Sequence, residues 1–290
     1  MEATADTLSG EPDDAADPLA KASGENFPVA SRLIRRDLRP AVLAFYRFAR
    51  AADDVADDPS EPAERKLAAL DRMEAGLDGR PGDAHAIVLR LAVSKHPRRE
   101  SLVASARALL GAFRQDARGA VYRDWGDLRA YCGRSADPVG RFLLDLHGEA
   151  PGARPPSNAL CTALQVLNHL RDLRADRDGL GRVYIPSDWL AEAGARPEHL
   201  SAASLSPGAR SAVDRTLDAC DALLREASPL PRLIASRGLR AQAAATLFLA
   251  GRLSARLRRG DPLAARIAPG RLDFGRAGLA GMWRAAWRAP

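Results

Sequence analysis

The chain has 290 residues, of which 46% are hydrophobic and 28% are charged, and this ordinary globular composition argues against disordered, collagen-like and disulfide-scaffold proteins. Its three cysteines, Cys132, Cys161 and Cys220, form no CxxC pair, which argues against a sulfur-ligated metal and favours a reduced, cytoplasmic protein. No window approaches the roughly 18 consecutive apolar residues of a membrane span, and the first twenty residues are acidic where a signal peptide would be basic and then apolar. We therefore expect a protein that is neither exported nor membrane-spanning.

The charge is distributed unevenly along the chain. The first twenty residues hold six acidic residues and no basic one, so the remainder carries 43 basic against 31 acidic residues, a net charge of +12. Such a basic body suits an anionic partner, which can be nucleic acid, a phosphorylated small molecule or an anionic lipid. The chain has no zinc-finger spacing and no aromatic RNP-like strand motif, so we expect no nucleic-acid partner.

Three regions are expected in chain order: a disordered acidic tail over 1–22, a helical domain over 23–262, and a basic tail over 263–290 that contains an amphipathic helix. The segments with helical spacing are 41–57, 64–76, 85–93, 101–117, 157–177, 211–227 and 239–258. Proline-containing breaks separate these segments, and no run of alternating β-branched residues is long enough for a sheet. The sequence predicts an all-α fold, a single bundle of about eight to ten helices.

The first segment ends in a row of carboxylates. Asp53 and Asp57 are four residues apart, so in a helix they project from one face, where like charges repel and call for a cation or solvent. Because Pro59 follows closely, this motif alone is also typical of a solvated helix end.

A second acidic stripe, in an otherwise apolar segment, favours a cation site over a solvated helix end. Asn168, Asp172 and Asp176 follow one another at four-residue intervals, and the segment from Cys161 to Leu173 is apolar enough to be buried. Two carboxylate pairs on separate helices predict a shared cavity in the bundle core, with Mg²⁺ as the natural cation because it prefers hard oxygen ligands and phosphate. Such a cavity suits the ionisation of a prenyl diphosphate, in which an apolar lining keeps water from a carbocation.

At this point the chain resembles a known family. Four segments carry the resemblance in order: NFPVAS over 26–31, AFYRFARAADDVAD over 44–57, YCGRSADPVGR over 131–141, and NHLRDLRAD over 168–176, which leads to GRVYIP over 181–186. Together they are similar to the squalene/phytoene synthase family over about residues 25–258. The resemblance implies an all-α isoprenoid-synthase fold, in which two Asp-rich motifs face each other across a central cavity and bind Mg²⁺-diphosphate.

Within that family, the segments around residues 25–31 and 135–141 look most like the bacterial hydroxysqualene synthase branch of hopanoid biosynthesis. This resemblance implies conversion of presqualene diphosphate and water to hydroxysqualene and diphosphate, without NADPH. It also implies two pathway partners, a presqualene diphosphate synthase and a flavin-dependent dehydrogenase. Arg134 stands where cyclopropane-forming relatives tend to have an aromatic residue, which argues against the first condensation step.

The resemblance also assigns roles to individual residues. It implies that Asp53 and Asp57 hold Mg²⁺ from the first motif, and that Asn168, Asp172 and Asp176 hold it from the second. Arg50 is one turn before Asp53 and is expected to reach the diphosphate. Arg182 and Tyr184 either close over the same group or anchor a loop, because arginine offers fixed donors to phosphate oxygens.

Other positions have weaker signals. Ala175 stands where the family often has Glu, which removes one acid but leaves Asp172 and Asp176. Asp116 resembles a family position but equally fits a polar helix end, and we interpret His169 as structural. Two alternative functions stay open: head-to-head condensation to presqualene diphosphate or phytoene, and a non-catalytic scaffold.

Near the end of the sequence, Trp283 and Trp287 are four residues apart, and each is followed by an arginine, Arg284 and Arg288. An amphipathic anchor at a membrane interface has this pattern, and so does a helix whose tryptophans pack on the bundle. With a lipid substrate, peripheral contact with the inner face of the cytoplasmic membrane is compatible with the sequence.

Overall fold

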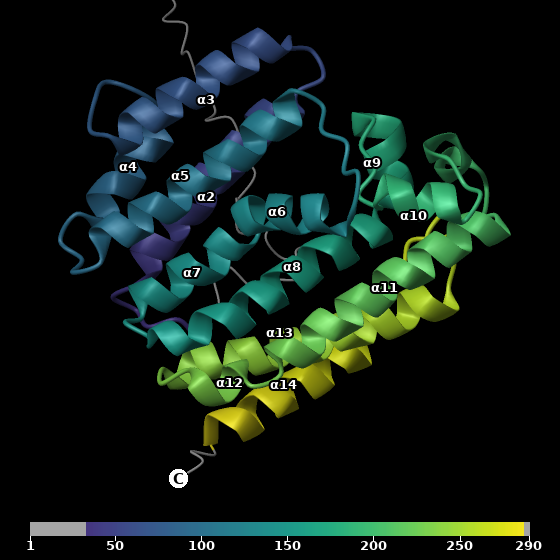
Figure 1. The fold of residues 1–290 in the computed structure, drawn as a ribbon. Helices are drawn as coiled ribbons and strands as arrows, with labels where there is room; N and C mark the ends of the chain where they lie inside the picture. Colours follow the sequence, from purple (N-terminus) through teal and green to yellow (C-terminus); the bar gives the residue numbers. More distant parts are fainter. Residues whose placement is uncertain (1–32, 287–290) are drawn as a thin grey trace, which may run out of the picture.

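The computed structural model describes residues 33–286, and within them every regular element is a helix (Figure 1). The predicted all-α class is confirmed. Our predictions for residues 1–22, for the segment 26–31 and for Trp287 lie outside the described part of the chain.

The described residues form thirteen α-helices and two short 3₁₀ helices, more than the eight to ten α-helices expected. The first group is α2 (Arg39–Asp57), α3 (Ala63–Leu77), α4 (Ala84–Val93) and α5 (Arg99–Ala117). The middle group is α6 (Trp125–Ser135), α7 (Asp137–Leu146), η2 (Pro151–Ala153), α8 (Arg154–Arg171) and α9 (Leu173–Leu180). The last group is α10 (Ser187–Glu192), η3 (Pro197–Ser201), α11 (Pro207–Ala227), α12 (Leu230–Leu233), α13 (Arg237–Arg259) and α14 (Arg271–Ala286).

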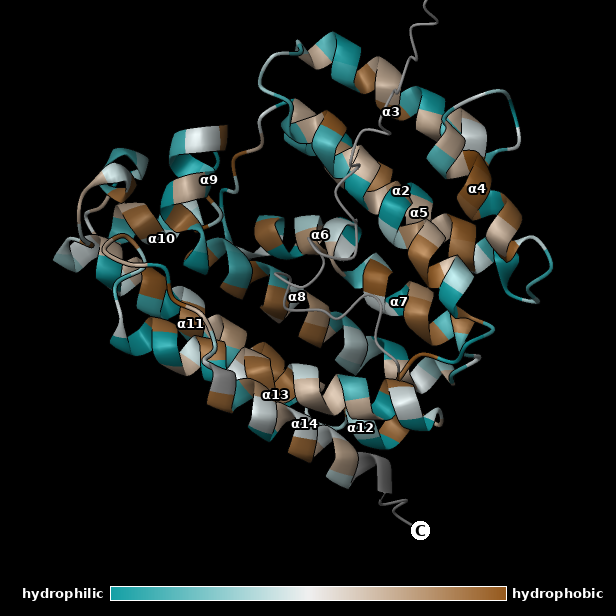
Figure 2. Ribbon diagram, turned by 180° about the vertical axis from the view of Figure 1, so that it is seen from behind, coloured by the Kyte–Doolittle hydropathy of each residue, from teal (hydrophilic) through white to brown (hydrophobic). Residues whose placement is uncertain are grey.

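The helices form two sides of one bundle with α6, α7 and α8 between them. Helices α2 to α5 pack against one another. Helix α7 packs against both α5 and α8, and α8 packs against α11. Helix α11 in turn packs against α13, which packs along α14 (Figure 1). Apolar residues follow α5, α7 and α8 through the middle of the molecule (Figure 2). The stacked rings of Phe45 and Phe142, with centroids 3.9 Å apart, join the first helix to the centre of the core.

Several helices begin at side chains that accept hydrogen bonds from exposed backbone N–H groups. Asp83 accepts from His85 and Ala86 at the start of α4, and Asp124 accepts from Asp127 at the start of α6.

Helices α6 and α7 were not predicted, because only Ala136 separates them and Pro138 follows at once. The structure places this proline in the first turn of α7, where its ring is tolerated.

The segment predicted as one helix over 157–177 is two helices, because the chain departs from helical geometry at Asp172. The Asp172 carboxylate accepts hydrogen bonds from the neighbouring Arg171, and the acidic residues predicted on one continuous helix are divided between α8 and α9. Short acidic side chains compete with helical geometry in this way, which accounts for the difference.

The C-terminal helix α14 packs along α13. Asp273 anchors its first turn by accepting from Arg252 Nε at 2.9 Å and from Arg256 Nη2 at 2.7 Å. The domain boundary at residue 262 stays a prediction.

Gly238, near the start of α13, permits a close contact with the backbone before α2. A Cβ atom at this position would lie 1.8 Å from the carbonyl oxygen of Leu33. We expect Gly238→Ala to destabilise the fold by about 1–3 kcal/mol, since backbone must move. Gly251→Ala, in the same helix with open space around it, is the control and should stabilise by up to about 1 kcal/mol. Chemical denaturation measures both, and equal effects of the two variants would contradict the packing argument.

Candidate active site

The first acidic motif lies at the end of α2, where an arginine is shared between two carboxylates. Arg50 Nη1 lies 3.3 Å from Asp53 Oδ2, and Arg50 Nη2 lies 2.7 Å from Asp54 Oδ1. Asp53 and Asp57 are partly buried, whereas the Asp54 side chain is 59% exposed. The helix ends at Asp57 because the proline at 59 restricts Asp58 to an extended conformation.

The second motif gives each carboxylate a different partner. Asp172 accepts from Arg171 Nε at 3.0 Å, and Asp176 Oδ2 lies 2.9 Å from His169 Nδ1. The other ring nitrogen of His169, Nε2, lies 2.9 Å from Gln165 Nε2. His169 therefore contacts one of the predicted ligands and helps to orient it.

Arg182 joins the two motifs across 125 positions of sequence. Its Nη1 donates to Asp57 Oδ1 at 2.6 Å, and its side chain is only 11% exposed. The turn after α9 places it there: Gly181 has φ 67°, its N–H donates to Arg177 O, and the Arg182 N–H donates to Asp176 O. This glycine-terminated helix end directs the chain from the second motif back to the first.

Tyr184 stacks on the imidazole ring of His169, with ring centroids 3.3 Å apart. It also belongs to a group of buried tyrosine rings with Tyr122, at 5.4 Å, and Tyr131, at 5.9 Å. These rings form an apolar wall next to the charged groups.

Asp116, at the end of α5, completes the cluster. It is 8% exposed and its Oδ2 accepts from Tyr131 Oη at 2.9 Å, while its Oδ1 has no hydrogen-bond partner within the described residues. Burial raises its pKa to about 6, although the nearby charge of Arg182 acts in the opposite direction. Burial, together with the charge of Asp57, raises the pKa of Asp53 to about 7. The site thus concentrates more negative charge than its own arginines neutralise.

This excess of negative charge suits binding of a cation. The charge lies on carboxylate oxygens, which are the ligands that hard cations such as Mg²⁺ prefer. No three His, Cys, Asp or Glu side chains of residues 33–286 lie close enough together to hold a metal ion as they stand. Burial raises the pKa values of Asp53 and Asp116, and a bound cation would favour the ionised forms of both carboxyls.

An apolar cavity of about 40 Å³ lies beside α8, on the face that carries Asn168. Ser157, Cys161 and Leu164 line it from α8 and precede Asn168 at intervals of four, three and four residues. These intervals place all four residues on one helical stripe. The apolar cavity therefore lies on the side of α8 that carries Asn168, one of the predicted Mg²⁺ ligands.

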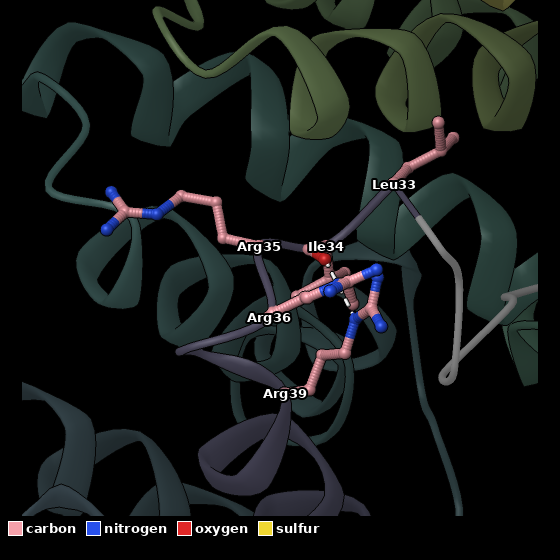
Figure 3. Close-up of a pocket in the computed structure, with 5 residues that line it drawn as sticks. All are labelled: Leu33, Ile34, Arg35, Arg36 and Arg39. Atoms are coloured by element: carbon pink, nitrogen blue, oxygen red, sulfur yellow. Dashed lines mark hydrogen bonds between the residues drawn. The ribbon is translucent and has the colours of Figure 1, made fainter.

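A larger, open pocket of about 530 Å³ lies elsewhere, at the start of α2 (Figure 3). Its lining includes Arg35, Arg36 and Arg39, and Arg39 Nε donates to Ile34 O at 3.0 Å. Arg39 precedes Asp53 by fourteen residues of α2, about 21 Å along the helix. This basic pocket is too far away to share one diphosphate with the acidic cluster.

Comparisons with known proteins show the family of this chain. The squalene/phytoene synthase family profile matches residues 20–277. The hydroxysqualene synthase of Zymomonas mobilis is 40% identical over 244 residues, 84% of this chain and 82% of that protein. The presqualene diphosphate synthase of the same organism is 30% identical over 182 residues, 61% of each chain. The crystal structure of the squalene synthase HpnC from Alicyclobacillus acidocaldarius superposes with a TM-score of 0.70 at 31% identity, covering 82% of this chain and 90% of that one.

The chain belongs to the squalene/phytoene synthase family. The resemblance inferred from the sequence is thereby confirmed, and the protein is an enzyme of that family. None of its described helices is long and apolar enough to cross a bilayer.

The contacts of the structure link four of the residues predicted for this family's site: Asp57, Asp176, Arg182 and Tyr184. Arg182 contacts Asp57, Tyr184 stacks on the histidine that contacts Asp176, and Asp172 lies at the junction of α8 and α9. Arg50 is paired with carboxylates of its own helix.

Three residues of the cluster were not singled out as site residues, although each had a signal in the sequence. Asp116 had been weighed as a family position, Tyr131 opens the YCGRS segment, and His169 follows Asn168 directly. Their contacts could not be inferred from spacing, because Asp116 and Tyr131 lie on different helices and His169 meets Asp176 across the break at residue 172.

The raised pKa of Asp53 predicts a pH dependence of stability in the metal-free protein. A carboxyl with a raised folded-state pKa contributes stability below about pH 4, and this contribution is lost as pH rises through about 7. The melting temperature of Asp53→Asn, relative to that of the wild type, should therefore rise between pH 5 and pH 8. Thermal unfolding in buffer with chelator measures this difference. Asp54→Asn, at an exposed position, should keep the wild-type pH profile, and identical profiles for all three proteins would contradict the assignment.

Proposed function

We propose that this chain is a hydroxysqualene synthase that converts presqualene diphosphate and water to hydroxysqualene and diphosphate. The proposal rests on the acidic cluster that Arg182 joins and on an apolar cavity on the side of α8 that carries Asn168, in a chain 40% identical to a hydroxysqualene synthase over most of both lengths. Ionisation of a prenyl diphosphate needs both environments at once: a charged end for the leaving group and a dry end for the cation.

Mg²⁺ is proposed as the cofactor, held by Asp53, Asp57, Asn168, Asp172 and Asp176, where it would neutralise charge on the diphosphate leaving group. The chain's own cations act on the same group. Arg182 and Arg50 offer N–H donors to phosphate oxygens, and Tyr184 covers the histidine that orients Asp176. The tyrosine rings beside Asp116 keep bulk water from the reacting carbon.

NADPH has no role in this proposal, because capture of the cation by water leaves nothing to reduce. Reactions of two classes must flank this one: a condensation that supplies presqualene diphosphate and a reduction that removes the hydroxyl group. We propose the presqualene diphosphate synthase and the flavin-dependent dehydrogenase as these pathway partners.

The test is incubation of purified protein with Mg²⁺, without NADPH, and with either presqualene diphosphate or farnesyl diphosphate, followed by mass analysis of the extracted lipids. We expect hydroxysqualene from presqualene diphosphate alone. A product from farnesyl diphosphate would reassign the protein to head-to-head condensation. No turnover of either substrate, together with no Mg²⁺-dependent binding of a diphosphate analogue, would indicate a scaffold.

We also propose that α14 contacts the inner face of the cytoplasmic membrane. Five of its side chains are large, apolar and at least half exposed, at the outer edge of the bundle (Figure 2): Leu272, Phe274, Leu279, Met282 and Trp283. The exposed Arg276 on the same helix suits an anionic headgroup. Such a face would bring the enzyme to a lipid substrate.

Co-sedimentation with vesicles of phosphatidylcholine and phosphatidylglycerol tests this contact. The double variant Leu279→Ser and Met282→Ser should bind at least about fivefold more weakly, since it removes exposed apolar area. The control is Leu91→Ser on α4, a leucine 59% exposed on a different helix, which should bind like the wild type. Equal binding of all three proteins would exclude α14 as the membrane contact.

A further inference from the structure

The Gln242 side chain is the least expected feature of the apolar cavity. It lies on α13, is only 2% exposed, and neither its Oε1 nor its Nε2 has a hydrogen-bond partner among the described residues. A primary amide can accept two hydrogen bonds and donate two, and burying one without partners is energetically costly. A buried amide of this kind indicates a ligand or an ordered water.

The size and lining of the cavity favour water. The cavity of about 40 Å³ has room for a bound water molecule, which needs roughly 10–15 Å³ of such space. Its walls are mainly leucine side chains from α7, α8 and α12, and the polar groups among them are Gln242, Thr246 and Ser157. Thr246 follows Gln242 by one helical turn, so the two lie on the same face of α13. A water held by the amide would have mainly apolar walls around it.

The cavity is also placed where a carbocation would be. Leu164, one of its lining residues, precedes Asn168 by one turn of α8, about 6 Å. The cation forms within a few bonds of the diphosphate oxygen that the acidic cluster is proposed to bind. Because Asn168 is a proposed ligand of Mg²⁺-diphosphate, the proposal places a water in this cavity on the hydrocarbon side of the leaving group.

We propose that Gln242 binds and orients the water molecule that captures the carbocation, an inference that rests on the proposed hydroxysqualene synthase function. The amide oxygen accepts a hydrogen bond from the water and so directs an oxygen lone pair toward the cation. That lone pair forms the new C–O bond. The proton lost from the water is taken up by the diphosphate that ionisation released, so the reaction consumes one water and yields the alcohol and hydrogen diphosphate.

A neutral amide suits this role better than a charged group. A carboxylate at the same place would be costly to bury and could itself add to the cation, whereas an amide holds water without a net charge. When no water is held there, the cation has another outcome: it loses a proton to diphosphate and becomes a hydrocarbon with one more double bond.

The decisive experiment is the product ratio of Gln242→Leu with presqualene diphosphate and Mg²⁺. We expect the ratio of alcohol to elimination hydrocarbon to fall at least about tenfold, and the ratio is independent of any general loss of activity. Leu239→Met, one turn earlier on α13 and lining the same cavity, is the control for altered packing and should keep the wild-type ratio. A wild-type ratio in Gln242→Leu would overturn the proposal.

A second measurement does not depend on turnover. A high-resolution crystal structure of the wild type should contain an ordered water within hydrogen-bond distance of the Gln242 amide, and Gln242→Leu should lack it. A dry cavity in the wild type would overturn the water site even if hydroxysqualene is made. Conversely, wild-type protein that makes no hydroxysqualene but holds this water would overturn the proposed function and leave the site in place.

Discussion

Asp53→Asn is expected to slow release of diphosphate from presqualene diphosphate by at least about 100-fold. In other enzymes, loss of a group that stabilises a developing anion has an effect of this size. The amide keeps the shape of the side chain but removes the charge that would hold Mg²⁺. Asp57→Asn should act in the same direction and also frees Arg182 from its ion pair. A phosphate-release assay with saturating substrate measures both.

Asp54→Asn is the matched control for this pair. Asp54 is on the same helix and shares Arg50 with Asp53, but its side chain is 59% exposed. We expect its rate to stay within about threefold of the wild type, in keeping with the small contribution of exposed ion pairs. Full activity in Asp53→Asn would sink the metal-clamp mechanism, and a large loss in Asp54→Asn would move the clamp to the outer face of α2.

The acidic motif on α2 could be predicted because its determinants are local. The four-residue interval between Asp53 and Asp57 fixes their relation within any helix, and the proline at 59 fixes where the helix ends. The same reasoning placed most of the long helices, but it merged α8 with α9 and missed shorter helices such as α6 and α7, which only one residue separates.

The relation between the motifs could not be derived from periodicity. The contact between Arg182 and Asp57 spans 125 residues, and only the turn at Gly181 brings it about. Family resemblance brought Arg182 to attention, but not its partner.

Asp116 shows a different limit of sequence reasoning. An aspartate at the end of an amphipathic helix is as typical of a solvated end as of a site. Its burial depends on α6, which supplies the hydroxyl of Tyr131, so the distinction needs tertiary packing. The unpartnered amide of Gln242 is likewise invisible in sequence, where it is one polar residue in an alanine-rich helix.

Arg182→Gln is expected to lower kcat/KM for presqualene diphosphate by at least about 100-fold, and Arg182→Lys by at least about tenfold. The guanidinium reaches Asp57 and lies near Asp116, and its planar array of donors can serve a carboxylate and a phosphate together. A lysine keeps the charge but not this geometry, so the substitution is not conservative here. Arg123→Lys is the control, because Arg123 is 81% exposed and pairs with Asp127 on the surface.

The same variants separate a role in substrate binding from a role in folding. If Arg182 only fastens the loop after α9 to α2, its loss should lower the melting temperature while kcat/KM, measured well below that temperature, stays near the wild-type value. If it acts on substrate through its place beside Asp57, Arg182→Gln and Asp57→Asn should be strongly non-additive in kcat/KM. Additive losses would mean that the two residues contact the diphosphate independently, and the ion pair between them would then belong to the substrate-free enzyme alone.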